Sequence, residues 1–127
     1  MTDCLPNVLV LSGWSAPVER WREVVAPSSP AVLCRFDGCA EPDDFIASAC
    51  EALSACASEV TVIGWSLGAM VGLELARAHP DRVRRMCLVG ATDRFVSQPG
   101  DAVGWSTRVL ERMERTVTES PDRVLGA

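Results

Sequence analysis

The sequence lacks a long hydrophobic run, a cluster of basic residues and any pair of cysteines with metal-binding spacing. Its apolar stretches are only a few residues long, far shorter than a membrane span requires. The first residues carry an acid instead of the basic residues of a signal peptide. The net charge of −5 argues against nucleic acid or an anionic membrane as a partner. We therefore expect a cytoplasmic protein that binds no metal and uses no cofactor.

Cysteine is common in the chain, but its pattern indicates no metal site. The 6 cysteines form no Cys-x-x-Cys pair, and the single histidine is no fourth zinc ligand. Cys34 and Cys87 fall in apolar runs that resemble strands, and Cys50 falls on the apolar face of a predicted helix. We interpret the cysteines as small buried side chains in a reducing compartment.

The first two thirds of the chain alternate between apolar runs and helical patterns. This alternation predicts parallel strands joined by helical crossovers. Because the apolar runs are continuous, both faces of the sheet should be covered, which makes an α/β three-layer sandwich with a mostly parallel sheet of about four strands. The expected strands are 7–12, 31–36, 60–64 and 84–90. One helix is expected after Pro17, a second with Asp43 or Asp44 as its N-cap, and a third from about Ser66.

The pattern changes after residue 90. A connection rich in Pro, Gly and polar residues precedes a helical stretch over 105–125, in which Trp105, Val109 and Met113 recur four residues apart. We therefore divide the chain into a sheet part, 1–95, and a part formed by the connection and a helix, 96–127. The apolar helix positions either line an acyl pocket or pack on the sheet part.

A serine lies between two glycines where a predicted strand runs into a predicted helix. The segment Gly64-Trp65-Ser66-Leu67-Gly68 fits the pattern G-x-S-x-G in the strand–turn–helix context that this motif needs. The glycines at 64 and 68 remove side chains that would collide in so tight a turn. Ser66 would then project at a helix N-terminus as a nucleophile, and the Leu67 amide would donate to an oxyanion.

A second oxyanion donor is expected in the loop after the first strand. Its residues are Ser12-Gly13-Trp14-Ser15. Gly13 allows close approach of the backbone, and the Trp14 amide is the natural donor. The Trp14 indole would then flank an acyl substrate, or alternatively would fill space between the loop and the core.

Together these residues resemble the α/β-hydrolase superfamily, and within it the pimeloyl-carrier methyl ester carboxylesterases of biotin synthesis. The resemblance rests on VLVLSGWS at 8–15, on GWSLGAMVGLELARAHPDRVRRMCLVGAT at 64–92 and on the Gly-Trp pair at 104–105. It covers the chain but only the N-terminal half of such an enzyme, so we expect an incomplete hydrolase sheet followed by the start of a helical lid.

The resemblance implies hydrolysis of a carboxylic ester whose acyl group is carried on an acyl-carrier protein. Ser66 would be the catalytic nucleophile, and Trp14, Trp65 and Trp105 would contact the substrate. One departure is the Ser12-Gly13 pair, which stands where the family usually has His-Gly. The backbone donor survives that change.

The larger departure from the family pattern concerns the catalytic base. In this superfamily the acid and the histidine follow later strands, which are not in this sequence. His79 lies on the same predicted helix as Ser66, and 13 residues of helix rise place it roughly 20 Å away. A general base must come within about 3 Å of its partner. We therefore expect the base and the acid to come from further sequence or from a partner chain.

Two other interpretations remain open. The same serine turn serves thioesterases, acyltransferases and a lyase of menaquinone synthesis. Alternatively, the chain is a truncated module that binds acyl ligands without turnover. An exposed sheet edge, where later strands would pair, would favour homodimers.

Overall fold

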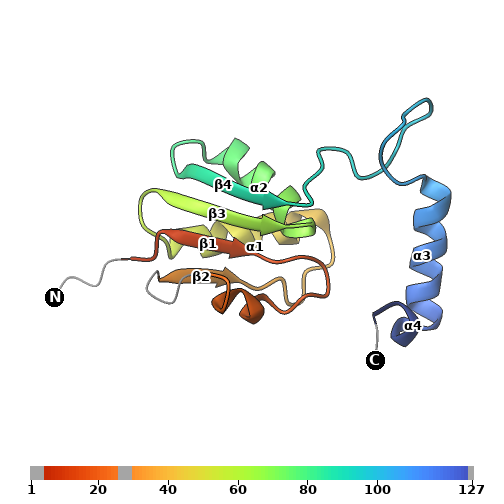
Figure 1. Cartoon of the computed structure of the whole chain (residues 1–127), viewed down its shortest axis with the longest axis horizontal. Coiled ribbons are helices and arrows are strands. Elements are labelled where there is room, and N and C mark those ends of the chain that lie inside the picture. Colours follow the sequence, from red (N-terminus) through yellow and green to blue (C-terminus); the bar gives the residue numbers. More distant parts are fainter. Residues whose placement is uncertain (1–4, 26–29, 126–127) are drawn as a thin grey trace. The chain divides into compact units, whose positions relative to one another are not determined.

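The computed structural model describes residues 5–25 and 30–125 and divides the chain into two compact units. The first unit is Met1–Ala91 and the second is Thr92–Ala127 (Figure 1). The sequence predicted a boundary after residue 95, and the structural division falls after Ala91.

The first unit is built on a four-stranded, wholly parallel sheet, as the sequence predicted. The strand order is β2-β1-β3-β4, so β1 and β3 are the central strands (Figure 1). The strands are short and rich in β-branched and aliphatic residues, which suit a sheet covered on its faces. Their bounds are Val8–Leu11 (β1), Ala31–Cys34 (β2), Val60–Trp65 (β3) and Val83–Val89 (β4).

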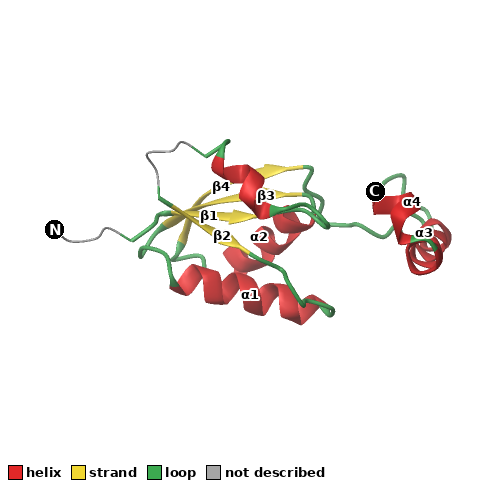
Figure 2. Cartoon of the chain, turned by 90° about the horizontal axis from the view of Figure 1, so that it is seen from below, coloured by secondary structure: helices red, strands yellow, loops and turns green. Residues whose placement is uncertain are grey.

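Helices cover the two faces of this sheet unequally. Helices α1 (Pro42–Ser54) and α2 (Leu67–Ala78) lie together on one face, and among the described residues of this unit the other face carries the short 3-10 helix η1 (Val18–Arg22) alone (Figure 2). The larger core cluster therefore forms beneath α1 and α2 and contains Leu9, Leu11, Leu53, Val62 and Leu75. The helix expected after Pro17 is thus reduced to little more than one turn.

The N-terminus of α1 is closed by two acidic side chains. Glu41 is the N-cap, and Asp44 Oδ2 accepts hydrogen bonds from the Glu41 amide at 2.9 Å and the Ala40 amide at 3.0 Å. These backbone donors lower the pKa of Asp44. The sequence favoured Asp43 or Asp44 as the cap, but the chain enters the helix two residues earlier, at Pro42, which suits the first helical position.

The opposite end of α1 is closed by an arginine from the loop before β4. Arg82 donates to the Leu53 and Ala57 carbonyls at 3.0 Å each and to the Ser58 carbonyl at 2.8 Å. These carbonyls lie at the helix C-terminus and just beyond it, where no amides of the same helix remain to bind them. Arg82 thereby ties β4 to α1.

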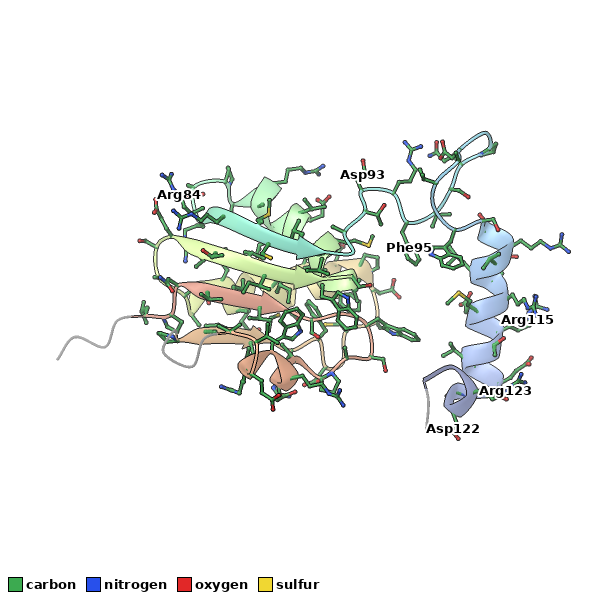
Figure 3. The ribbon with its side chains drawn as sticks, in the orientation of Figure 1. Arg84, Asp93, Phe95, Arg115, Asp122 and Arg123 are labelled. Carbon is green, nitrogen blue, oxygen red and sulfur yellow. The ribbon has the colours of Figure 1, made fainter. Side chains whose placement is uncertain are left out.

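Strand β4 forms one edge of the sheet. Met86 and Val89 are exposed by 44% and 49%, and Arg84 projects into solvent near the start of the strand (Figure 3). Cys87 is also exposed, which corrects the expectation that it is buried. The sequence pattern of a strand does not reveal that it lies at an edge. Pairing of two copies along this edge stays a prediction.

The second unit consists of a turned segment and two helices, α3 (Thr107–Glu119) and α4 (Pro121–Leu125). In the segment, the backbone amide of Trp105 donates to the Phe95 carbonyl at 2.8 Å, and the Trp105 carbonyl accepts from the Ser97 amide at 2.9 Å. Helix α3 is amphipathic, with Arg115 pointing outward (Figure 3) and with Val109 and Met113 exposed by 38% and 42%. Within the described part of this unit, α3 buries no residue.

Candidate active site

Ser66 occupies the junction between β3 and α2 in a backbone conformation that L-residues rarely adopt. Its φ is 53° and its ψ is −116°. The glycines on either side are required by contact: a Cβ at Gly64 would lie 2.8 Å from the Ala69 Cα, and one at Gly68 would lie 2.0 Å from the Leu11 carbonyl oxygen. The chain therefore holds Ser66 in a strained turn that larger neighbours would prevent.

The side chain of Ser66 is not used to cap its helix. Both α2 and α3 begin after a serine, but only Ser106 accepts a hydrogen bond from its helix, from the Val109 amide at 3.4 Å. Ser66 makes no side-chain capping bond, and its residue is exposed. Its hydroxyl is therefore available to a ligand.

The loop after β1 lies beside this junction. Gly13 is buried, and a Cβ there would lie 2.9 Å from the Trp65 ring, so the loop backbone packs directly on that indole. The Ala16 amide donates to the Gly13 carbonyl at 3.3 Å, and Ser15 has a φ of 56°. This is the geometry of a type II turn, whose third residue is usually Gly.

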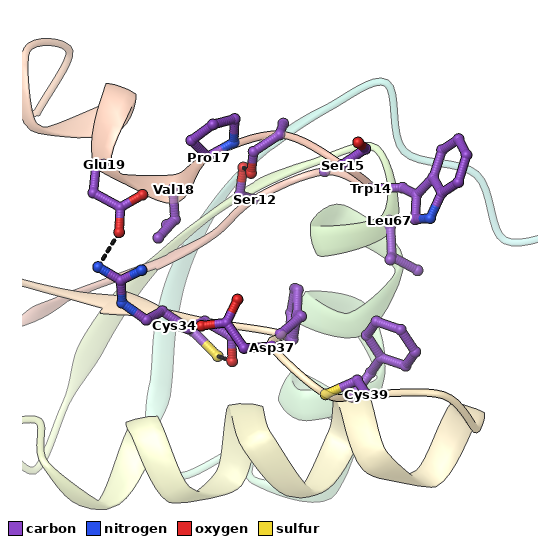
Figure 4. Close-up of a pocket in the computed structure, with 15 residues that line it drawn as sticks. Ser12, Trp14, Ser15, Pro17, Val18, Glu19, Cys34, Asp37, Cys39 and Leu67 are labelled. Carbon is purple, nitrogen blue, oxygen red and sulfur yellow. Dashed lines mark hydrogen bonds and ion pairs between the residues drawn. The ribbon is translucent and has the colours of Figure 1, made fainter. Parts of the chain in front are cut away.

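The two expected oxyanion donors both border one pocket. Leu67 is the first residue of α2, where amides have no partner in their own helix. Trp14, with 55% of its side chain exposed, lies on the opposite loop (Figure 4). Both residues line a pocket of about 510 Å³, and Ser66 is not part of its lining.

This pocket opens between the loop after β1 and the loop after β2 (Figure 4). Sequence reasoning missed the second loop, which contributes Arg35, Phe36, Asp37 and Cys39. A signal was available, because the carboxyl ends of neighbouring parallel strands meet at one edge of a sheet. Ligands of open α/β sheets bind at that edge, so the residues after 34 could be predicted to line a site together with those after 11.

The other two expected substrate contacts are Trp65, in the first unit, and Trp105, in the second. Trp65 covers Gly13 and lines a smaller pocket of about 190 Å³ with Ala16, Pro17 and Trp21 among its other walls. Trp105 belongs to the second unit, where it is 52% exposed and bonded within its own segment. Of the two tryptophans in the first unit, Trp14 lines the larger pocket and Trp65 does not.

His79 lies at the far end of α2 from Ser66. It is the C-cap of the helix of which Ser66 is the N-cap. Its ring Nε2 lies 3.6 Å from the Cys50 sulfur of α1. The chain's single histidine therefore joins two helices and does not reach the serine.

Two buried cysteines, Cys34 and Cys56, are unsuited to nucleophilic chemistry. Burial, with smaller effects of Cys39 and Glu51, raises the pKa of the Cys34 thiol to about 12. Burial also raises the pKa of Cys56. Both thiols therefore stay protonated near neutral pH and act as core side chains. Cys4 lies outside the described residues.

Two features are absent from the described part of the chain. No three His, Cys, Asp or Glu side chains there are arranged to hold a metal ion. Nor is any helix over the same residues long and apolar enough to cross a membrane.

The comparison with protein families matches residues 43–124 to the α/β-hydrolase fold. The chain belongs to the α/β-hydrolase family. A marine microorganism esterase has the same fold, with a TM-score of 0.56, 18% identity, and coverage of 93% of this chain and 48% of the esterase. The parallel sheet is thus part of an α/β-hydrolase fold.

Several curated relatives of this chain carry the same name. A pimeloyl-[acyl-carrier protein] methyl ester esterase of Aromatoleum aromaticum is 31% identical over 105 residues, which are 76% of this chain and 42% of that protein. A protein of the same name from Neisseria meningitidis serogroup C is 29% identical over 122 residues, covering 89% of this chain and 47% of the relative. The chain thus spans about half the length of these curated relatives.

Proposed function

We propose that this chain is the N-terminal portion of a serine ester hydrolase, with Ser66 as its nucleophile. The observation that supports this most directly is the strained backbone of Ser66 together with its free hydroxyl at the start of α2. Strain of this kind persists where the surrounding contacts enforce it, and it is concentrated at functional sites. Ser106 begins a helix without such strain and uses its hydroxyl as a cap.

In the proposed reaction the Ser66 oxygen attacks the carbonyl carbon of a carboxylic ester. The carbonyl oxygen gains negative charge, which the Trp14 and Leu67 amides stabilise at the helix N-terminus. The bond to the alcohol oxygen then breaks, and the alcohol leaves with the proton that Ser66 has lost. Water hydrolyses the acyl-serine and regenerates the hydroxyl.

The general base in this proposal is a group other than His79. That histidine is held at the opposite end of α2 beside Cys50, and a base must come within about 3 Å of the serine oxygen. Further sequence or a second chain would supply the base and the acid that orients it.

The proposed substrate is a pimeloyl methyl ester carried on an acyl-carrier protein. The names of the relatives at 29% and 31% identity support this choice. A second candidate is an acyl-binding module without turnover, which the distant position of His79 favours. The same serine turn also admits a thioesterase, an acyltransferase or a lyase.

A serine-reactive fluorophosphonate probe and a p-nitrophenyl ester test the proposal on the chain as it stands. Where a second copy of the chain supplies the base, we expect the probe to label the wild type and Ser58→Ala, which removes an exposed serine before β3, and to leave Ser66→Ala unlabelled. Labelling with ester turnover would support the hydrolase, and labelling without turnover would support the binding module. Equal labelling of Ser66→Ala and wild type would refute a nucleophilic Ser66.

A further inference from the structure

A thiol and an imidazole meet between α1 and α2, the two helices that lie together on one face of the sheet (Figure 2). The Cys50 sulfur of α1 lies 3.6 Å from His79 Nε2, which is hydrogen-bond distance for sulfur. Both residues are half-buried, so neither is sealed in the core. When the ring carries its proton on Nδ1, Nε2 accepts the proton of the thiol.

The backbone of His79 is held on both sides, which fixes the position of its ring. The His79 amide donates to the Leu75 carbonyl at 2.9 Å. The His79 carbonyl accepts from the Arg82 amide at 3.0 Å and from the Val83 amide at 3.1 Å. None of these bonds uses the imidazole. As the C-cap of α2, His79 also lies where the negative end of a helix dipole stabilises a charged ring. The position therefore suits a side chain that gains a proton during a reaction.

Two other cysteines show what is particular to Cys50. Cys39 is half-buried to the same class, but its sulfur lies 3.3 Å from the Ser48 hydroxyl, which is a far weaker base than an imidazole. Cys87 is exposed on β4. Because the chain has a single histidine, which contacts Cys50, neither of these thiols has an imidazole beside it. Access to solvent and a neighbouring base are thus combined at Cys50.

We propose that Cys50 is a modification site at which a low-molecular-weight disulfide forms a mixed disulfide, with His79 as the general base. The imidazole accepts the thiol proton while the Cys50 sulfur attacks one sulfur of the disulfide. A bond forms between these two sulfurs, and the bond within the disulfide breaks. The departing thiolate takes the proton from His79. One thiol and one disulfide give one mixed disulfide and one new thiol, so no further oxidant is needed.

The modification acts on the packing of the two helices. A mixed disulfide has no thiol proton to donate, so its formation removes the hydrogen bond that joins α1 to the end of α2. Ser66 is the N-cap of α2 and His79 is its C-cap, so the site lies at the opposite end of the helix from the serine turn. An excess of a free thiol reverses the exchange and restores Cys50.

Hydroxyethyl disulfide is a suitable probe, because it is neutral and is not attracted to charged side chains. The fully reduced chain is mixed with the probe at neutral pH, and the adduct at each cysteine is followed by mass spectrometry. We expect Cys50 to react about tenfold faster than Cys39, which has similar access to solvent but no base. A rate at Cys50 equal to or below that at Cys39 would overturn the proposal.

His79→Gln isolates the role of the base. Glutamine keeps the backbone bonds at this position and still accepts a hydrogen bond, but it does not take up the proton. The rate at Cys50 should fall about tenfold, and the rate at Cys87 should stay that of the wild type. Arg77→Gln is the matched control, an exposed position near the same end of α2, and should leave Cys50 unchanged. If Cys50 reacts equally fast in His79→Gln and wild type, His79 is not its base.

The buried cysteines distinguish this role from a structural one. If His79 only held α1 against α2, its replacement would loosen the packing and raise the rates at the buried Cys34 and Cys56. We expect both to stay slow in His79→Gln, and a rise at either would overturn the proposal. Ser66→Ala should react at Cys50 like the wild type, so the result is independent of the proposed esterase chemistry.

Discussion

Gly68 of α2 packs directly on the carbonyl group of Leu11 at the end of β1. A Cβ at Gly68 would lie 2.0 Å from that oxygen and 2.4 Å from the carbonyl carbon, and both atoms belong to backbone that cannot rotate away. This contact sets how closely the first turn of α2 approaches β1. It therefore also sets the separation between Leu67 and the loop that carries Trp14.

Replacing Gly68 with Ala should destabilise the first unit by about 3 kcal/mol, because the helix start must move away from β1. Gly72→Ala is the matched control on the same helix, since its Cβ would meet side chains and no backbone, the nearest being Val62 at 3.2 Å. Because alanine has a higher helix propensity than glycine, Gly72→Ala should change the free energy of unfolding by less than about 1 kcal/mol. Urea denaturation measures both, and equal effects would contradict the contact.

Ser66→Gly should stabilise the chain by about 1 kcal/mol relative to wild type, because glycine adopts a φ of 53° without strain. Ser66→Ala keeps the Cβ and should change the free energy of unfolding by less than about 0.5 kcal/mol. Chemical denaturation of the three proteins gives the comparison. A Gly variant no more stable than the Ala variant would argue against backbone strain.

Ser15→Gly should also stabilise, by about 0.5 to 1 kcal/mol, since the third residue of its turn has a φ of 56°. Ser15→Ala is the control that keeps the Cβ and should bring no gain. The thermal midpoint of unfolding, measured by circular dichroism, is sufficient to rank the variants. The prediction fails if Ser15→Ala stabilises as much as Ser15→Gly.

Arg82→Lys should lower the free energy of unfolding by about 2 kcal/mol, because an ammonium group cannot reproduce the three hydrogen bonds to carbonyls at the end of α1. Arg77→Lys is the control on α2, where the exposed arginine makes one long contact with Glu74 at 3.5 Å. Its effect should stay within about 0.5 kcal/mol. Equilibrium unfolding in urea distinguishes the two, and a silent Arg82→Lys would show that charge alone closes the helix.

The stabilisation that Asp44 gives the first unit should be lost in acid. Its pKa in the folded chain lies below the ordinary value of 3.8, because the Glu41 and Ala40 amides donate to the carboxylate. The stabilisation is therefore fully present well above pH 3.8 and is lost as the pH falls below that value through the folded pKa. The difference in thermal midpoint between wild type and Asp44→Asn should be constant at neutral pH and shrink in this acid range.

The strand pattern and the serine turn were accessible from the sequence because both are local. Continuous apolar runs predicted the four parallel strands. The spacing of Gly64 and Gly68 around Ser66 reflects collisions within one turn, so it can be read without knowing the rest of the fold. The short η1 was not foreseen, because a few apolar residues at helical spacing do not tell how long the helix continues.

The pocket and the exposed cysteine could not be read in the same way. Asp37 and Trp14 line the same pocket because β1 and β2 are neighbours in the sheet, which is a property of strand order and not of either loop. Cys87 has the sequence surroundings of a buried residue, but β4 is an edge strand. The role of Arg82 depends on carbonyls more than 20 residues earlier in the chain.

The pocket draws on a loop that has no part in the serine turn, and this separation bears on how the protein can evolve. The residues after β2 contribute walls to the pocket, whereas Ser66, Gly64 and Gly68 belong to β3 and α2. Substitutions at positions such as Asp37 can therefore change which molecule is held without disturbing the strained turn. A lineage could acquire new ligands through this loop while the chemistry of its serine stays under separate selection.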